Sequence, residues 1–329
     1  MNGAGPRQVL VTPRSFGRGD AALRDELAAA VDDVTWSQGG DLDADALREL
    51  VARADGWIAG LETIDRSVLE SADRLKVIAR YGVGVDNVDL AAAAERGIVV
   101  TNTPGANAGA VAELVVGLML ALARRIPQAD RAVRQGTWGR MDGVALEGKV
   151  VGLLGFGAIG REVARRVAAM GCTVVTHDPA PAAPAAAADL GVRFAGRDEV
   201  IATSDFLSLH MPVLPDTRGS VDAAFLAAMK PGAFLVNAAR GELVDEAALV
   251  EALSSGQLAG AALDALAEEP PPPGFALGAL DNVILTPHVG AHTDHAVSSM
   301  GRAAMANCLA VLRGEPAPNP VAPPTQRRT

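Results

Sequence analysis

A glycine-rich turn between a strand pattern and a helix pattern constrains the fold of this chain most. Residues 155–160 read Gly-Phe-Gly-Ala-Ile-Gly, with the apolar run 150–154 before them and a helix-like run, 161–170, after them. In such a unit the first glycine permits a tight turn, and the second lets the backbone approach a pyrophosphate. The third allows the helix to pack closely on the strand, and the helix N-terminus attracts the anion. The pattern therefore predicts a strand–turn–helix unit that binds a dinucleotide; the alternative is a turn that packs but binds nothing.

The residues that follow indicate which dinucleotide. A second strand-like run, residues 173–177, ends directly before Asp178. An acid about 20 residues after the turn can bond the ribose hydroxyls of the adenosine. Asp178 would repel a 2′-phosphate, and residues 179–188 contain no Lys or Arg that could accommodate one. We therefore expect NAD rather than NADP as the cofactor.

Strand and helix patterns alternate in two successive sets along the 329 residues, a length that suggests about two domains. The strand patterns lie at residues 9–12, 34–36, 57–59, 77–79 and 98–100, and then at 150–154, 173–177, 206–209, 234–237, 261–264 and 283–286. Helix patterns at residues 21–31, 43–54, 65–71 and 90–96 belong to the first set, and a long helix pattern, 107–123, precedes the second. Such alternation implies parallel sheets covered on both faces. We predict an α/β fold of two Rossmann-like, doubly wound parallel-sheet domains with a cleft between them.

The last helix pattern decides where the domains are divided. Residues 294–312 follow the second set with no strand after them, so this helix can return to pack on the first domain. We predict a substrate domain of the flavodoxin-like kind from residues 1–103 and 288–329, and an NAD-binding Rossmann domain from residues 104–287. The Pro-rich end, residues 315–329, is expected to fray.

Composition excludes several classes of partner. The net charge is −10 and no basic stripe occurs, so we expect no nucleic-acid partner. The longest apolar stretch, residues 114–123, is too short to span a bilayer, and the polar, Gly-rich residues 1–8 do not resemble a signal peptide. The cysteines, Cys172 and Cys308, form no metal or redox motif. This usage fits a reducing cytosol, so we expect a cytoplasmic protein without a metal and without a membrane partner.

Three titratable or charged residues follow strands of the second set, at the sheet edge where open parallel sheets bind ligands. They are Arg240, Glu269 and His288. A histidine can exchange a proton with a hydroxyl or carbonyl oxygen, and a neighbouring acid can orient the ring and raise its pKa. An arginine can hold a carboxylate and polarise the adjacent carbonyl. Together these groups suit the reversible oxidation of a 2-hydroxy acid, although position alone leaves open that each is an ordinary polar residue.

Eight segments give the chain a family resemblance over residues 9–312. They are residues 81–89, 101–107, 154–160, 204–212, 236–241, 261–265, 268–270 and 286–290. In these segments the chain resembles the D-isomer-specific 2-hydroxyacid dehydrogenases. The resemblance implies that Arg240, Glu269 and His288 are catalytic, and that Val83 and Gly84 bind the substrate carboxylate through backbone N–H groups. Arg240 is then a substrate-binding residue as well.

The resemblance and the glycine turn together imply a set of cofactor-binding residues at the ends of the second-set strands. These are Gly155, Phe156, Gly157, Ala158, Ile159, Gly160, Asp178, His210, Pro212, Thr217, Ala238, Asp264 and Gly290. Asp264 falls on the position that contacts the nicotinamide carboxamide, and His210 on a wall of the cofactor site. His177 is interpreted as a strand residue, and His292 is a rival to His288 as proton carrier.

Within the family the chain is most similar to the 3-phosphoglycerate dehydrogenases. Arg80 matches a substrate-side arginine of that group, and Arg140 in residues 138–140 matches an arginine of the dimer arm, which implies a homodimer. Gly60 departs from the pattern, because phosphoglycerate enzymes usually carry a phosphate-binding arginine near that position. The substrate is therefore a small D-2-hydroxy or 2-keto acid: 3-phosphoglycerate is one candidate, and hydroxypyruvate, glyoxylate or phosphonopyruvate are the alternatives. A non-catalytic NAD(H)-sensing interaction protein is the rival from another class.

Overall fold

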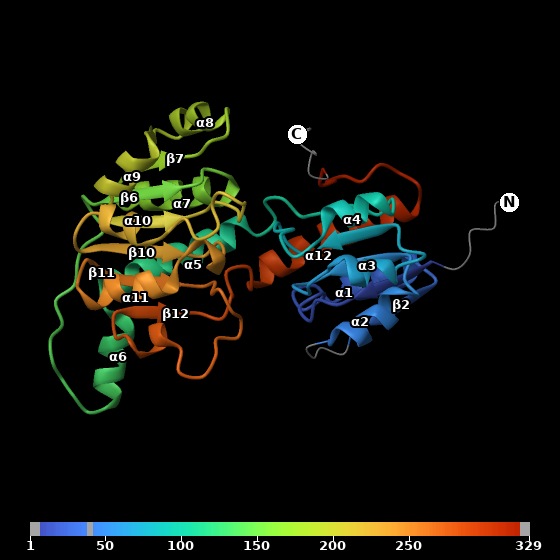
Figure 1. Ribbon diagram of the computed structural model, residues 1–329, viewed down its shortest axis with the longest axis horizontal. Helices are drawn as coiled ribbons and strands as arrows, with labels where there is room; N and C mark the ends of the chain where they lie inside the picture. Colours follow the sequence, from blue (N-terminus) through green and yellow to red (C-terminus); the bar gives the residue numbers. More distant parts are fainter. Residues whose placement is uncertain (1–6, 38–41, 323–329) are drawn as a thin grey trace. The chain divides into compact units, whose positions relative to one another are not determined.

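The structure, a computed structural model, describes residues 7–37 and 42–322 of the chain. It divides into two compact units (Figure 1), the first made of Met1–Asn107 with His292–Thr329 and the second of Ala108–Ala291. The second unit begins at residue 108 and ends at residue 291, in each case four residues after the predicted limits of 104 and 287. The first boundary falls where helix α5 (Ala108–Ala123) begins, and the second falls shortly before helix α12 (Asp294–Leu312).

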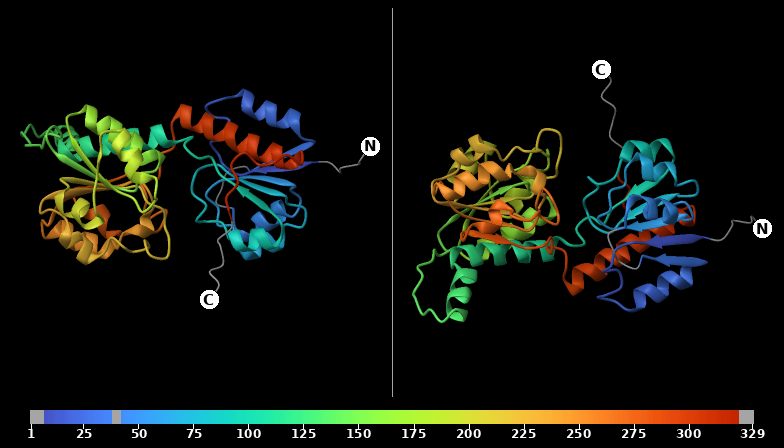
Figure 2. Two further views of the ribbon diagram at one scale, coloured as in Figure 1. Left: turned by 90° about the horizontal axis from the view of Figure 1, so that it is seen from above. Right: turned by 60° about the horizontal axis from the view of Figure 1, so that its bottom comes forward.

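The first unit is a five-stranded sheet in the order β2-β1-β3-β4-β5, with every pair parallel. Its strands are β1 (Gln8–Val11), β2 (Asp33–Trp36), β3 (Gly56–Ala59), β4 (Val77–Arg80) and β5 (Val99–Thr101). Its helices besides α12 are α1 (Ala22–Ala30), α2 (Ala44–Val51), α3 (Arg66–Glu70) and α4 (Leu90–Glu95). Helices α1 and α12 cover one face of the sheet and α2, α3 and α4 the other (Figure 2). After the second unit, the chain thus returns to the first sheet through α12, which contacts β3 and β4.

The second unit is a seven-stranded parallel sheet in the order β12-β11-β10-β9-β6-β7-β8. Its strands are β6 (Val150–Leu154), β7 (Thr173–His177), β8 (Arg193–Phe194), β9 (Phe206–Leu209), β10 (Ala233–Asn237), β11 (Leu258–Leu263) and β12 (Val283–Leu285). Besides α5, its helices are α6 (Ile126–Arg134), α7 (Ala158–Ala169), α8 (Ala183–Asp189), α9 (Arg197–Thr203), α10 (Ala223–Ala228) and α11 (Glu246–Ser254). The order reverses beside β6, which is the point where doubly wound sheets bind their ligands.

Strand β6 shows why the sequence pattern found this sheet. The strand lies in the middle of the sheet with helices on both faces, so four of its five residues are buried and its sequence, Val-Val-Gly-Leu-Leu, is continuously apolar. Aromatic side chains are few: Phe206 and Phe234 stack at 4.7 Å in a core that also contains Phe156 and is mostly aliphatic. The predicted class, α/β with two Rossmann-like parallel sheets, is confirmed.

Two features of the fold differ from the sequence prediction. The two-residue edge strand β8 was not expected. Of the Pro-rich end predicted to fray, residues up to 322 are described, and Val321 N donates to Val100 O at 2.8 Å while Pro320 forms an antiparallel bridge with Thr101. The chain here adds to the exposed edge of β5 because an edge strand presents unpaired backbone groups. Residues 323–329 lie outside the described residues.

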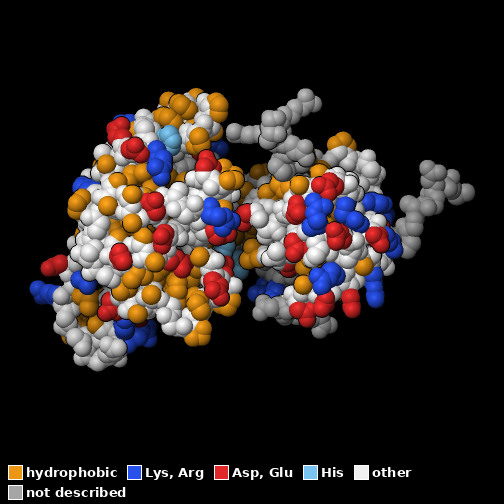
Figure 3. All heavy atoms as spheres, in the orientation of Figure 1, with side chains coloured by type: hydrophobic (Ala, Val, Ile, Leu, Met, Phe, Trp, Pro, Cys, Tyr) orange, Lys and Arg blue, Asp and Glu red, His pale blue; other side chains and the backbone are white. Residues whose placement is uncertain are grey.

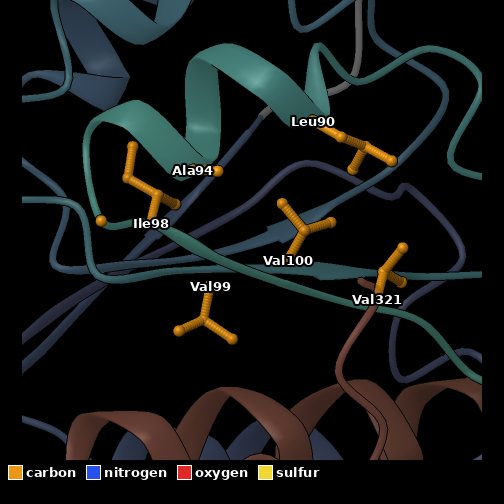
Figure 4. Close-up of a pocket in the computed structure, with 7 residues that line it drawn as sticks. Leu90, Ala94, Ile98, Val99, Val100 and Val321 are labelled. Atoms are coloured by element: carbon orange, nitrogen blue, oxygen red, sulfur yellow. The ribbon is translucent and has the colours of Figure 1, made fainter. Parts of the chain in front are cut away.

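An apolar cavity of about 290 Å³ lies beside this edge in the first unit (Figure 4). It is lined by Leu90, Ala94, Gly97, Ile98, Val99, Val100 and Val321. None of these side chains is titratable or polar, so the cavity offers no group for proton or hydride chemistry. On the face that Figure 3 shows, acidic and basic side chains are interspersed.

Candidate active site

The glycine turn is shaped by two close backbone approaches at the carboxyl end of β6. Gly155 has φ 101°, a conformation that favours glycine, and a Cβ on it would overlap the carbonyl oxygen of His210. A Cβ on Gly160 would overlap the carbonyl oxygen of Gly155. Gly157, in contrast, has nothing within 4 Å of the position its Cβ would take. The turn therefore leaves open space at the N-terminus of α7, which fits a pyrophosphate held by backbone N–H groups.

Asp178, at the end of the neighbouring strand β7, is bonded to this turn. One carboxylate oxygen accepts a hydrogen bond from Phe156 N at 2.7 Å, and the other accepts one from Ala180 N at 2.7 Å. The half-buried carboxylate thus fixes the glycine turn and places a negative charge where the predicted ribose hydroxyls would lie. His177, the residue before it, contacts Ala195 O through Nδ1 at 3.1 Å, as expected of a strand residue with a partner.

His210 follows β9, the strand next to β6. Its ring nitrogen Nε2 is buried and has no hydrogen-bond partner among the described residues, and burial lowers the pKa of His210 to about 4. The ring is therefore neutral near pH 7. In the loop that follows, Thr217 Oγ1 donates to Pro212 O at 2.7 Å and closes the loop after this strand. Ala238 comes directly after β10, the next strand, so all these predicted cofactor residues lie at one sheet edge.

His288 and Glu269 form a close pair at the same edge. Nδ1 of His288 lies 2.9 Å from Oε2 and 3.1 Å from Oε1 of Glu269. Leu266 N donates to Oε1 of Glu269 at 2.9 Å and fixes the carboxylate. Because Nδ1 faces the carboxylate, the neutral ring carries its hydrogen on Nδ1 and presents Nε2 for proton exchange.

The electrostatics of the pair favour a charged imidazole. The hydrogen bond to Glu269 raises the pKa of His288 above its ordinary value, against burial and the nearby Arg240, which lower it. Burial raises the pKa of Glu269, but the hydrogen bonds from His288 and Leu266 outweigh it and the net pKa is lowered. Glu269 is therefore ionised at neutral pH and stabilises protonated His288.

Asp264 holds the segment that carries His288. Its carboxylate, at the end of β11 and 2% exposed, accepts hydrogen bonds from Thr286 Oγ1 at 2.6 Å, Val289 N at 2.9 Å and Gly290 N at 2.9 Å. Its carbonyl oxygen accepts from His288 N at 2.9 Å. His288 itself has φ 52°, which a residue other than glycine adopts only when its surroundings impose it. A Cβ on Gly290 would lie 3.0 Å from the Asp264 carboxylate, so glycine at this position allows the close approach.

Arg240 is held at the same sheet edge with the help of another close backbone approach, at Gly241. Asn237, the last residue of β10, donates through Nδ2 to Arg240 O at 2.8 Å. A Cβ on Gly241 would overlap the backbone of Leu266, so this glycine lets the Arg240 turn pack against the loop that leads to Glu269. The structure thus gathers Arg240, Glu269 and His288 within the second unit, with the glycine turn at the same sheet edge.

The other predicted residues lie in the first unit or outside regular structure. Arg80, at the end of β4, is 3% exposed and donates through Nη1 to Ala59 O at 2.8 Å and through Nε to Gly84 O at 3.2 Å. The exposed Val83, next to Gly84, accepts at its carbonyl from Asn102 Nδ2 at 2.9 Å. Arg140 is exposed in the segment after α6.

His292, the rival proton carrier, falls in a different unit from His288. It belongs to the first unit and lines a cavity of about 200 Å³ there, together with Ser15, Arg18 and the first residues of α12. His288, in contrast, belongs to the second unit, together with Glu269 and the glycine turn.

Sequence reasoning missed three residues that build the site. Asn237 and Thr286 hold the Arg240 turn and the His288 segment, and Gly241 permits the approach of the two loops. The signals that could have identified them were their positions, one to three residues from a predicted catalytic residue and inside the family-resemblance segments 236–241 and 286–290.

The fold and the site define a dinucleotide-binding protein built on two doubly wound sheets. The family described as D-isomer specific 2-hydroxyacid dehydrogenase, NAD binding domain, matches residues 116–290 by its sequence profile. The chain belongs to the D-isomer-specific 2-hydroxyacid dehydrogenase family, and its second unit is the family's NAD-binding domain. The predicted resemblance and the predicted NAD cofactor are confirmed.

Individual relatives agree with this assignment. The D-3-phosphoglycerate dehydrogenase of Mycobacterium tuberculosis is 42% identical over 318 residues, which cover 95% of this chain and 58% of that protein. The enzyme of the same name from Archaeoglobus fulgidus is 44% identical over 260 residues, or 78% of this chain and 49% of that protein. The chain thus spans about half the length of these curated relatives.

Solved structures match along their whole length. The TT0316 protein from Thermus thermophilus is 41% identical with a TM-score of 0.84, covering 96% of this chain and 100% of that one. A glyoxylate reductase from Paecilomyes thermophila is 30% identical with a TM-score of 0.86, covering 97% and 99%.

Proposed function

We propose that the protein is an NAD-dependent D-2-hydroxyacid dehydrogenase, which interconverts a small D-2-hydroxy acid and its 2-keto acid. The observation that carries the proposal is the His288–Glu269 pair, held beside Arg240 in the unit that contains the glycine turn. The names of the relatives, D-3-phosphoglycerate dehydrogenase and glyoxylate reductase, support the same reaction class. They leave 3-phosphoglycerate, hydroxypyruvate, glyoxylate and phosphonopyruvate as candidate acids or keto acids.

The residues of this chain supply proton transfer and charge stabilisation. When bound, NAD supplies the nicotinamide ring that accepts or gives a hydride at C2 of the substrate. Nε2 of His288 takes the proton from the hydroxyl in oxidation and returns it to the carbonyl oxygen in reduction. Glu269 stabilises the imidazolium, and Arg240 pairs with the substrate carboxylate and the reacting oxygen. Val83 and Gly84 would donate backbone N–H groups to that carboxylate, with Arg80 supporting their loop through Gly84 O.

The proposed cofactor contacts follow the geometry of the second unit. Within the turn of residues 155–160, the N–H groups of residues 157–160 at the start of α7 would hold the pyrophosphate, because Gly155 N and Phe156 N already donate to His177 O and Asp178. Asp178 would bind the adenosine ribose and Asp264 the carboxamide. The remaining members of the set, His210, Pro212, Thr217, Ala238 and Gly290, form the walls around the nicotinamide half. In this proposal the second unit binds NAD and supplies Arg240, Glu269 and His288, and the first unit supplies Val83 and Gly84 for the substrate carboxylate.

We also propose a homodimer and a cytoplasmic location. Helix α6 and the segment after it expose Ile126, Val133 and Trp138 at 52%, 53% and 90%, and such exposed apolar side chains suit a partner surface that carries Arg140. Sedimentation of the active protein as a monomer would contradict the dimer.

The two cysteines are free thiols, which fits the proposed location in a reducing compartment. Among the helices of the described residues, none combines the length and apolarity needed to cross a membrane.

A turnover assay tests the reaction. NADH oxidation is followed with hydroxypyruvate, 3-phosphohydroxypyruvate, glyoxylate, pyruvate and phosphonopyruvate, using His288→Ala as the matched control. The proposal is supported if the wild type reduces at least one of these keto acids and His288→Ala reduces it much more slowly. NADH binding without any turnover would favour the non-catalytic NAD(H)-sensing alternative.

A further inference from the structure

Two carbonyl oxygens of the loop after β4 are bonded by the segment that directly follows β5. Gly82 O accepts a hydrogen bond from Thr103 N at 3.0 Å, and Val83 O accepts one from Asn102 Nδ2 at 2.9 Å. A trans peptide group directs its N–H opposite to its carbonyl, and both peptide groups are trans. The N–H groups of Val83 and Gly84 therefore point away from the segment after β5.

These two N–H groups are available to a ligand. Among the described residues, neither Val83 N nor Gly84 N donates to a backbone or side-chain acceptor. Val83 is 39% exposed, so the loop is open to solvent. Successive backbone N–H groups that point to one side can bind an anion such as a carboxylate. The bonds from the segment after β5 thus hold the amides in the orientation that a carboxylate requires.

Asn102 is itself held by two asparagines from distant parts of the chain. Its carbonyl oxygen accepts from Asn307 Nδ2 at 2.8 Å, and its N–H donates to Asn319 O at 3.2 Å. Asn319 Nδ2 donates to Asn307 Oδ1 at 3.2 Å, which closes a ring of three asparagines. Asn307, within α12, is fully buried, so its amide depends on these partners. The asparagine ring therefore fixes the residue that bonds Val83 O.

The C-terminal strap, residues 319–321, carries the third asparagine and is also anchored outside the ring. Val321 N donates to Val100 O at 2.8 Å, and Pro320 forms an antiparallel bridge with Thr101. The side chain of Val321 lines the apolar cavity shown in Figure 4. Backbone bonds and apolar packing thus keep the strap on the edge of β5, within reach of α12.

The charges on the loop after β4 are separate from the asparagine ring. Arg80 donates through Nε to Gly84 O at 3.2 Å, and its positive charge favours a carboxylate at this loop. Asp86 adds a negative charge further along the loop, and both side chains make further interactions. Replacing a ring asparagine by alanine leaves both charges in place. A change in carboxylate binding would then report on the orientation of the N–H groups.

We propose that Asn102, Asn307 and Asn319 are positioning residues, which direct the N–H groups of Val83 and Gly84 at the substrate carboxylate. The C-terminal strap then contributes to substrate affinity through Asn102 rather than by contact. This role rests on the proposed function, in which those two N–H groups bind the carboxylate. A ring that only fastened α12 to the sheet would affect stability and leave the KM for the keto acid unchanged.

The test uses the full-length protein, NADH and the keto acid that the wild type reduces best in the turnover assay. Asn102→Ala removes the bond to Val83 O, so KM for the keto acid should rise about fivefold to tenfold. Asn319→Ala loosens the ring one step further away, so KM should rise about threefold. Because the carboxylate is bound alike before and during hydride transfer, kcat and the Kd for NADH should stay within about twofold of the wild type in both variants.

Asn282→Ala is the matched control, because Asn282 also donates through Nδ2 to a backbone carbonyl, that of Leu253 at 3.4 Å, in the second unit. Its KM should equal that of the wild type. Asn319→Ala keeps the test open if Asn102→Ala does not fold.

The positioning role is overturned if the folded ring variants keep the wild-type KM, even with a lower Tm. It is also overturned if kcat or NADH affinity falls as much as KM rises, or if Asn282→Ala raises KM equally. In each of these cases the proposed reaction still stands. A wild type that reduces no 2-keto acid would instead remove the proposed function, and the positioning role with it.

Discussion

The charge on Glu269 can be separated from its shape by the substitution Glu269→Gln. The amide oxygen of glutamine can still accept the hydrogen bond from His288 Nδ1, now 2.9 Å from the carboxylate. The variant therefore keeps the orientation of the imidazole and removes the negative charge that stabilises its protonated form. Any change in activity then reports on electrostatics rather than on a displaced ring.

The size of the effect follows from the geometry of the pair. A hydrogen bond to a charged group is stronger than a neutral one by about 1–2 kcal/mol. The side chains of His288 and Glu269 are 30% and 36% exposed, so solvent screening reduces the difference to about 1 kcal/mol. Because about 1.4 kcal/mol corresponds to a factor of ten, kcat/KM should fall about fivefold at the optimal pH.

The pH profile gives the direction of the change. Glu269 raises the pKa of His288, so the variant should have a lower one. Reduction needs protonated His288, and its activity should therefore disappear at a lower pH in the variant than in the wild type. Oxidation needs the neutral ring, and its rise with pH should begin at a lower pH.

The assay measures kcat/KM for keto-acid reduction between pH 5 and 9, with Glu268→Gln as a control for the loss of one charge at a neighbouring exposed residue. A profile for Glu269→Gln that stays in place or moves to higher pH would refute the electrostatic role of Glu269.

Three further changes have expected outcomes. His288→Ala should lower kcat about 10²–10⁴-fold with little change in NADH affinity, whereas His292→Ala should keep a kcat near that of the wild type. If steady-state kinetics show the large loss in His292→Ala instead, His292 is the proton carrier. Wild-type protein should use NAD at least about tenfold better than NADP in kcat/KM, and Asp178→Ala should narrow that ratio; equal use by the wild type would contradict the assignment. Gly241→Ala should lower the free energy of unfolding in urea by about 1–3 kcal/mol, because the added methyl overlaps the backbone of Leu266. A fully stable variant would show that this approach is not needed.

The sequence predicted the sheets well because their strands are buried on both faces. Such strands, like residues 150–154 and 206–209, appear as apolar runs regardless of what pairs with them. Strand β8, only Arg193–Phe194, has no such run, since one residue is exposed and the other half-buried. Val321 pairs with β5, whose edge is available only because of how a segment distant in the sequence folds. No local pattern in the Pro-rich stretch could therefore predict this pairing.

The sequence suggested candidate residues for the site but not how their side chains meet. Arg240, Glu269 and His288 stand shortly after strands, which identifies them as candidates at one sheet edge. Their approach depends on features with no local signature: the overlap that Gly241 avoids and the left-handed conformation of His288. Glu269 and His288 are nineteen positions apart in the sequence, and that spacing alone cannot show that the two side chains meet.

Asp264 explains how the loop residue His288 can be held as accurately as its proposed role in proton transfer requires. Loops are the most mobile parts of a fold, whereas reacting groups must be positioned to a fraction of an ångström. The carboxylate of Asp264 sits at the end of β11, a strand hydrogen-bonded on both sides by β10 and β12. Through it the segment from Thr286 to Gly290 is bonded to the sheet itself rather than to another loop. The glycine turn also begins at a strand end, that of β6, so His288 and the proposed nicotinamide site share one rigid frame of reference.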